Sequence, residues 1–228
     1  MAQFVNQART AFVFDMDGTL FDSVDQIISA ANSTRIEFGY ESREKVFYIP
    51  FIGLPARNLF IDLNLLESEE KNFVLKFREY LSKLIKTDNK LFNGAIEFLQ
   101  RSKDSNIFVG IATTKPSALA QLVVENSKIS DLVDHVQGTD NFKPKPDPTV
   151  ILRCLEQFKA NKAIMFGDRI EDMIAGKAAG VKSIGISQSF HTKEELHKSG
   201  ADLVVDNFVT LLEKWDSVIG MLDKNEVL

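Results

Sequence analysis

The sequence contains little cysteine, no long apolar run and no cluster of basic residues, and each absence excludes a class of protein. Cys154 is the single cysteine in 228 residues, which excludes an internal disulfide framework and favours a reducing compartment. No stretch approaches the roughly 18 consecutive apolar residues of a membrane helix. Residues 1–9, MAQFVNQAR, lack the apolar run of a signal peptide. We therefore expect a cytoplasmic protein with no membrane partner.

Positive charge is also in the minority. There are 27 lysines and arginines and 32 aspartates and glutamates, which gives a formal net charge of −5. We expect no nucleic-acid partner, because no run of basic side chains is long enough to follow a phosphate backbone. The 44% of hydrophobic residues can form a packed interior, and the length favours one main core with a smaller module.

The neighbours of Cys154 predict a buried thiol. Val150, Ile151, Leu155 and Phe158 share its helical face. On such a face, a cysteine is much more often a small apolar core residue than a nucleophile.

Short apolar runs recur along the chain and predict a parallel sheet. Most are continuous and do not alternate with polar residues, which is typical of strands buried on both faces. Helical patterns separate them, with predicted caps or first turns at Asn93, Pro116, Asp147–Pro148 and Thr192. A final helix is predicted over 208–222. Strands and helices in alternation predict an α/β fold with helices on both faces of the sheet. The runs cover residues 11–14, 107–112, 133–136, 163–166, 183–186 and 203–205.

One segment interrupts this alternation. From Val24 to about Lys86 the apolar spacing is helical throughout, with no strand pattern inside it. We predict that residues 20–87 form a helical cap domain inserted into a core domain made of residues 1–19 and 88–228. The hinges are expected near residues 19–23 and 87–92.

Two aspartates directly follow the first apolar run, in the stretch AFVFDMDGTLFDS. Ligands of open α/β sheets gather at the carboxyl ends of the strands, which is where Asp15 and Asp17 fall. Gly18 and Thr19 allow a sharp turn whose N–H groups suit an anion. Because two close carboxylates repel each other, a shared cation such as Mg²⁺ is expected beside them.

Polar groups follow the other strands as well. Thr113 and Thr114 come after the second strand, Lys143 lies in the proline-rich loop FKPKPDP, and Asp168 and Asp172 come after the fourth strand. Each has an ordinary structural explanation: a helix cap for the threonines, a solvated lysine in a turn, and a carboxylate favoured by a helix dipole. Their common place after strands predicts that they meet at one edge of the sheet.

The order of these groups resembles the haloacid dehalogenase superfamily along the whole chain. DMDGT looks like its first motif, Thr113 in IATTKP its second, Lys143 in KPKPDP its third and GDRIED its fourth. The position of the helical insert is similar to the α-helical cap of the phosphoglycolate phosphatase-like branch. The resemblance implies a Rossmann-like parallel sheet with strand order 3-2-1-4-5 and an inserted helical cap.

The resemblance also implies a role for each group. Asp15 would be the nucleophile that forms an aspartyl-phosphate, and Asp17 the acid and base that moves protons. Thr113 would hydrogen-bond the phosphoryl oxygens, with Gly18, Thr19 and Thr114 as further substrate contacts. Lys143 would offset the charge of nucleophile and phosphate. Mg²⁺ would be bound by Asp15, by the carbonyl of Asp17, by Asp168 and by Asp172, the last directly or through water.

Two positions depart from the usual family pattern. Arg169 stands where the family often has a serine after the GD of the fourth motif. Asn106 stands where a glycine usually ends the helix before the second strand, and asparagine suits that place because it tolerates the left-handed region.

The residues also distinguish between other activities of this superfamily. A dehalogenase would lack Asp17. A β-phosphoglucomutase-like phosphotransferase holds its second phosphate with an arginine three residues after a cap glycine, and here Ala56 takes that place after Gly53, with Arg57 one residue later. A phosphonatase would need a desolvated lysine in the cap. Lys45 and Lys71 are candidates, but nothing in the sequence indicates that either is desolvated. A non-catalytic binding protein on this fold would have no reason to keep all five of the groups that carry the chemistry, which are Asp15, Asp17, Thr113, Lys143 and Asp168.

The sequence therefore predicts a Mg²⁺-dependent phosphatase for a small phosphorylated metabolite, present as a monomer or homodimer. The cap must select the substrate, and Gly53 and Arg57 are its predicted contacts, although a tight turn before a helix explains that loop equally well. Phosphoglycolate, nucleotides, sugar phosphates and pyrophosphate all stay open as substrates.

Overall fold

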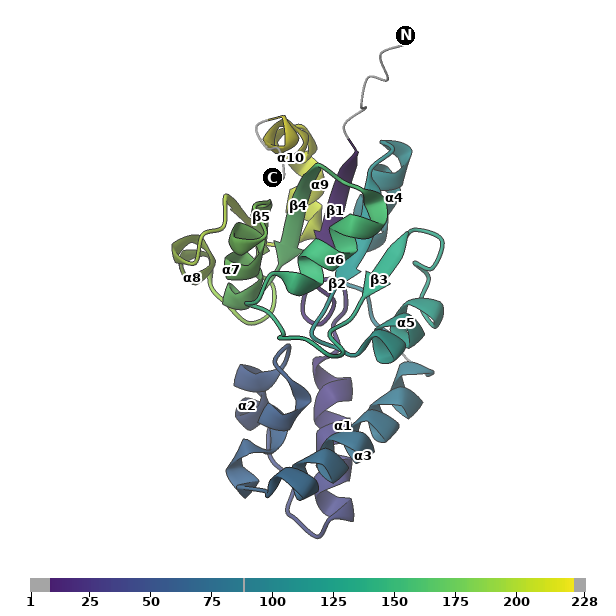
Figure 1. Cartoon of the computed structure of the whole chain (residues 1–228), viewed down its shortest axis with the longest axis vertical. Coiled ribbons are helices and arrows are strands. Elements are labelled where there is room, and N and C mark those ends of the chain that lie inside the picture. The colour runs from purple at the N-terminus through teal and green to yellow at the C-terminus, as the bar shows by residue number, and fades with distance from the viewer. Residues whose placement is uncertain (1–8, 88, 224–228) are drawn as a thin grey trace.

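A parallel sheet of six strands forms the centre of the molecule (Figure 1). The computed structural model describes residues 9–87 and 89–223. The expectation that the N-terminus lacks a signal peptide rests on residues 1–9, of which 1–8 lie outside the described residues. The strand order is β3-β2-β1-β4-β5-β6, which confirms the expected order and extends it by one strand. The strands are β1 (Thr10–Phe14), β2 (Phe108–Ala112), β3 (His135–Gln137), β4 (Lys162–Gly167), β5 (Lys182–Ile186) and β6 (Leu203–Val205).

The central strand β1 separates two different cores. Phe12 and Phe14 point to one face of the sheet, where Phe14 stacks on Phe166 with ring centroids 4.6 Å apart. Ala11 and Val13 point to the other face. Both sets are fully buried, because strand residues alternate between faces and helices cover both. The continuous apolar run that predicted this strand is therefore explained by burial on both sides.

Helices of the core cover each face in turn. On the phenylalanine face lie α4 (Ala95–Asp104), α5 (Ser117–Glu125), α9 (Phe208–Glu213) and α10 (Trp215–Leu222). On the small-residue face lie α6 (Thr149–Phe158) and α7 (Ile170–Ala178). The short α8 (Lys193–Lys198) packs beside β6. Cys154 of α6 is fully buried, as predicted, and a Cβ on Gly110 of β2 would collide with its sulfur.

The residues between β1 and α4 form a helical layer below the carboxyl ends of the strands (Figure 1). Its elements are α1 (Val24–Glu37), α2 (Lys45–Tyr48), the 3₁₀ helices η1 (Ile49–Phe51) and η2 (Ala56–Leu63), and α3 (Glu67–Ile85). Helices α1 and α3 pack closely against each other. We call residues 24–87 the helical segment. Its treatment as a cap domain with the expected boundaries stays a prediction.

The two connections between the helical segment and the core run side by side. The N–H of Asp22 donates to the carbonyl of Lys90 at 2.8 Å, and the N–H of Phe92 donates to that of Leu20 at 3.0 Å. Phe21 also forms an isolated bridge with Leu91. The two connections are thus hydrogen-bonded to each other at residues that lie within the ranges where hinges are predicted.

Some local expectations are confirmed and others are wrong. Thr192 caps α8 with Glu195 in the predicted capping box, and Asn106 has the expected left-handed backbone, with φ of 56°. The single helix expected over 208–222 is instead two, because Lys214 leaves the helical region with ψ of 17° between α9 and α10. No helix in the described part of the chain is long and apolar enough to span a membrane.

Candidate active site

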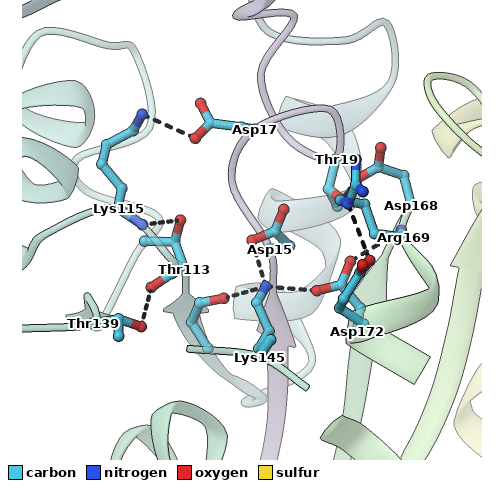
Figure 2. A network of polar contacts seen from close by, with 12 residues as sticks. Asp15, Asp17, Thr19, Thr113, Lys115, Thr139, Lys145, Asp168, Arg169 and Asp172 are labelled. Atoms are coloured by element: carbon cyan, nitrogen blue, oxygen red, sulfur yellow. Dashed lines mark hydrogen bonds and ion pairs between the residues drawn. The ribbon is translucent and has the colours of Figure 1, made fainter. Parts of the chain in front are cut away.

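Asp15 lies at the carboxyl end of the central strand, immediately after Phe14. Its N–H donates to the carbonyl of Phe166 at 2.8 Å, so the backbone that carries the carboxylate is fixed between two neighbouring strands. The residue is only 3% exposed. Its Oδ1 accepts a hydrogen bond from Lys145 Nζ at 2.6 Å (Figure 2). A carboxylate held this rigidly suits the in-line approach of a nucleophile to phosphorus.

Lys145, and not Lys143, reaches this carboxylate. Its Nζ lies 2.6 Å from Asp15 Oδ1 and 2.6 Å from Asp172 Oδ1, and it donates to the carbonyl of Ala112 at 3.0 Å. Lys143 is exposed on the same loop. The residue expected to offset the charge is thus two positions later than predicted. Both lysines precede a proline, so sequence context could not choose between them, and the path of the loop decides.

Two further aspartates follow β4 and reach the same place. Asp168 is fully buried, and its Oδ1 accepts from the Thr19 hydroxyl at 2.7 Å, while its Oδ2 is buried with no partner among the described residues. Asp172 Oδ2 accepts from the N–H of Arg169 at 3.1 Å, which closes the first turn of α7. Gly18, with φ of 89°, passes so close that a Cβ there would lie 2.5 Å from Asp168 Oδ2.

Burial and mutual repulsion change the proton affinity of these groups. Burial raises the pKa of Asp15 to about 7, against the opposing pull of Lys145 and with further help from Asp172 and Asp17. The pKa of Asp168 is raised well above its usual value by burial and by the carboxylates of Asp15 and Asp172. Burial alone would lower the pKa of Lys145, but Asp15 and Asp172 outweigh it and raise it. The cluster therefore carries more negative charge than one lysine can balance.

The donor set of this cluster fits a hard divalent cation. Asp15, Asp168 and Asp172 each offer a carboxylate oxygen, and these oxygens all lie within 4.8 Å of one another. The unpartnered Oδ2 of Asp168 is the kind of buried acceptor that requires a cation or a proton. Carboxylate oxygens are the protein ligands that Mg²⁺ prefers. Three of the four residues predicted to bind the metal are thus brought together through their side chains.

The carboxylate of Asp17 lies apart from this cluster and has partners of its own. Its Oδ1 accepts from the Ser23 hydroxyl at 2.7 Å, and its Oδ2 pairs with Lys115 Nζ at 2.9 Å. Figure 2 shows it directed toward Lys115 and away from Lys145. Strand β1 ends at Phe14, so the alternation of an extended chain does not continue through Asp17. The structure therefore separates the Asp17 carboxylate from the three clustered carboxylates.

Sequence reasoning missed Lys115, Ser23 and Lys145. Lys115 belongs to the quoted IATTKP stretch and Ser23 ends AFVFDMDGTLFDS, so both were in view. Polar residues beside a motif are common, however, and nothing in the residue types shows that these two reach Asp17 across the turn.

The predicted phosphate contacts are placed in two ways. Thr113 is buried at the end of β2, where its hydroxyl accepts from the N–H of Lys115 at 3.2 Å. Thr114 lines a cavity. The N–H of Gly18 instead donates to the carbonyl of Phe21 at 2.8 Å, and the Thr19 hydroxyl is bound to Asp168. The Gly18 N–H and the Thr19 hydroxyl thus hold the loop together, and the anion contacts expected of these two residues stay predictions.

A cavity of about 340 Å³ lies between the core and the helical segment. The core contributes Asp17, Thr114 and Lys115 to its wall, and the helical segment contributes Gly53 and Arg57, the two predicted substrate contacts. A cavity of this size accommodates a small metabolite. It brings Asp17 and the segment expected to select the substrate to the same space.

Arg169 joins the loop after β4 to the helical segment. Its Nη1 donates to the carbonyl of Ile52 at 2.6 Å, and its Nη2 donates to that of Pro50 at 3.4 Å. Gly53, with φ of 86°, lies so close that a Cβ there would be 2.7 Å from the Arg169 Cδ. The departure from the family's serine therefore replaces a hydroxyl by a side chain that bridges the two parts of the molecule.

Comparisons with known proteins agree with this geometry. The family model for haloacid dehalogenase-like hydrolases matches residues 12–186. A putative pyrophosphatase, PpaX, of Caldanaerobacter subterraneus is 31% identical, with 90% of this chain and 93% of that protein covered. A phosphoglycolate phosphatase of Haemophilus influenzae is 27% identical, with 87% and 95% covered. The crystal structure of a predicted phosphatase from Clostridium acetobutylicum superposes with a TM-score of 0.82 at 26% identity, covering 92% and 99%.

Proposed function

Because the chain belongs to the haloacid dehalogenase-like hydrolases and is a phosphatase of that family, we propose that it hydrolyses a small phosphate monoester through an aspartyl-phosphate, with Mg²⁺ as cofactor. The observation that carries the proposal is that two aspartates, Asp15 and Asp17, are held by different partners. Asp15 is fixed by Lys145 at the end of the central strand. Asp17 is held separately by Ser23 and Lys115 at the wall of the cavity.

The proposed reaction has two steps. An Asp15 carboxylate oxygen attacks phosphorus, the bond from phosphorus to the leaving oxygen breaks, and the Asp17 carboxyl gives its proton to that oxygen. Asp17 then takes a proton from water, the water oxygen attacks phosphorus, and the acyl-phosphate bond breaks to release inorganic phosphate and restore Asp15. Lys115 holds the Asp17 carboxylate in place between the two steps.

The remaining groups balance charge. Lys145 stabilises the negative charge that Asp15 shares with the phosphoryl group, and Thr113 donates its hydroxyl to a phosphoryl oxygen. Asp15, Asp168 and Asp172, with the backbone carbonyl of Asp17, would hold Mg²⁺. When bound, the ion would supply further positive charge to stabilise the transferring phosphoryl group.

The names of the relatives narrow the substrate. Phosphoglycolate and pyrophosphate each carry a second acidic group besides the phosphoryl group that is transferred. We propose a substrate of phosphoglycolate type, with pyrophosphate as the second candidate. A β-phosphoglucomutase-like transfer is less favoured, because Ala56 stands where that group has its phosphate-binding arginine.

A phosphate-release screen tests this function. Purified protein with Mg²⁺ is offered a broad panel of phosphomonoesters and pyrophosphate, and the Asp15→Asn variant serves as the matched control. We expect release from at least one small ester, and loss of at least about 10³-fold of the rate in the variant at nearly unchanged thermal stability. Near-normal turnover by Asp15→Asn would contradict the mechanism. No release from any compound would favour the non-catalytic binding protein.

A further inference from the structure

A second basic side chain of the helical segment lines the same cavity and was not singled out by the sequence. Arg78 lies on α3, and it contributes to the cavity wall together with Arg57. Its Nε is buried without a hydrogen-bond partner. A buried guanidinium N–H left unpaired is costly, since it has lost water and gained nothing in exchange. Such a donor is expected to have a partner when the protein binds its ligand.

The other arginines of the helical segment show that the lack of a partner is not common to all of them. Arg35 and Arg43 both pair with Asp62, at 2.9 and 3.0 Å. Neither Arg57 nor Arg78 forms a side-chain hydrogen bond or ion pair with any residue in 9–87 or 89–223. The paired arginines stabilise the segment itself, whereas the two unpaired ones line the cavity.

The charges around the cavity leave a positive excess on this side. On the core wall, Asp17 and Lys115 neutralise each other, and Asp140 keeps its negative charge while it accepts hydrogen bonds from the N–H and hydroxyl of Ser117. Glu70 also lines the wall, and no ion pair joins it to a described residue. One glutamate thus stands against two arginines, so the wall formed by the helical segment attracts an anion.

We propose that Arg78, together with Arg57, binds a second anionic group on the leaving portion of the substrate, while the transferred phosphoryl group is held at Asp15. The substrate class is therefore a phosphate ester or diphosphate whose leaving group carries its own carboxylate or phosphate. Guanidinium groups bind both of these oxyanions through paired N–H donors. This inference rests on the proposed phosphatase function and adds to it what the cavity recognises.

Matched acids and amides test the inference. The phosphate esters of glycolic, 3-hydroxypropionic and 4-hydroxybutyric acid are each compared with the corresponding neutral carboxamide, and pyrophosphate is assayed in parallel as the diphosphate. The wild-type protein is expected to have a higher kcat/KM for at least one acid than for its amide. The three chain lengths show how far the second anionic group can lie from the transferred phosphate. Comparison with pyrophosphate shows whether the site prefers a carboxylate or a phosphate as that second group.

Arg78→Gln is the decisive variant. We expect it to lower kcat/KM for the preferred anionic substrate by about tenfold or more, the effect of losing a hydrogen bond to a charged group, and to leave the amides unchanged. Lys83→Gln is the control, because it removes one cation from the same helix at a side chain that is 64% exposed and paired with Glu79. Lys83→Gln should leave kcat/KM unchanged for both the anionic substrate and its amide. Glu70→Gln should act in the opposite direction and raise the preference for the acid.

The outcomes separate this inference from the function on which it rests. If wild type hydrolyses acids and amides equally, or if Arg78→Gln lowers both alike, the anion-binding role is refuted while the phosphatase stands. If Arg78→Gln folds poorly, Arg78→Lys and Glu70→Gln still decide, because an unchanged preference in both would also overturn the proposal. Failure to release phosphate from any compound would instead refute the proposed function.

Discussion

The core and the helical segment, which both line the cavity, differ in how their charged side chains are held. On the core side, the carboxylates of Asp15 and Asp17 each have a lysine within 3 Å, Lys145 and Lys115. On the side of the helical segment, Arg57 and Arg78 have no partner among the described residues. Fixed groups need no reorganisation when the reaction occurs, which favours catalysis. Unpaired groups are free to meet whatever the substrate brings, which favours selection.

The same difference is seen in burial. Lys145 and its two carboxylate partners have side chains at most 5% exposed, and Asp15 directly follows the central strand of the sheet. Arg57 is exposed and Arg78 is half-buried. Chemistry common to many substrates is therefore placed on the rigid sheet, and recognition of the part that varies is placed on helices outside it.

The largest effect is expected from Lys145→Gln compared with Lys143→Gln. The first removes the one lysine that pairs with Asp15 and Asp172 among the described residues, so kcat should fall by about 10²- to 10³-fold. The free energy of unfolding should fall by about 3 kcal/mol, because buried carboxylates lose their partner. Lys143→Gln alters an exposed side chain and should leave both unchanged. Steady-state kinetics and urea denaturation measure the two quantities. Equal losses in both variants would refute the assignment of Lys145.

Removal of the metal should have the next largest effect. Binding of Mg²⁺ to the native protein alone stabilises it by about 2.7 kcal/mol when the ion is present at 100 times its dissociation constant. We therefore expect Mg²⁺ to raise the melting temperature of protein previously treated with a chelator. Asp168→Asn removes one of the three clustered carboxylates and should reduce that rise. A melting temperature that is insensitive to Mg²⁺ in the wild type would argue against the metal site.

The fold was predictable from the sequence, whereas the partners of the site were predictable only in part. Apolar runs located the strands, since burial on both faces demands them, and polar residues after strands located Asp15, Thr113 and Asp168. The choice of Lys145 over Lys143 depends on the path of a loop, which residue types do not encode. The break at Lys214 has no glycine or proline to mark it. Arg78 was missed because a basic residue on a helix usually points to solvent.

A smaller effect is expected where the two walls are joined, at Arg169. Arg169→Ser restores the family's usual residue and removes the hydrogen bond to the Ile52 carbonyl. The loop that carries Gly53 should then be less firmly held over the core, so KM should rise by about three- to tenfold, with a smaller change in kcat. Amide hydrogen exchange of residues 51–53 should become faster. Arg169→Lys keeps the charge and should recover part of both. Unchanged exchange in Arg169→Ser would show that the contact does not hold the loop.

The smallest effect on activity is expected from Cys154→Ala. Cys154 lies in the core between α6 and the sheet and does not line the cavity. Burial raises the pKa of its thiol to about 12, so the reactive thiolate is scarce at neutral pH. The variant should retain full phosphatase activity and lose about 1 kcal/mol of stability from imperfect packing. The wild-type thiol should react with iodoacetamide only after unfolding. Loss of activity in Cys154→Ala at unchanged stability would mean that the chemistry is not confined to the carboxyl ends of the strands.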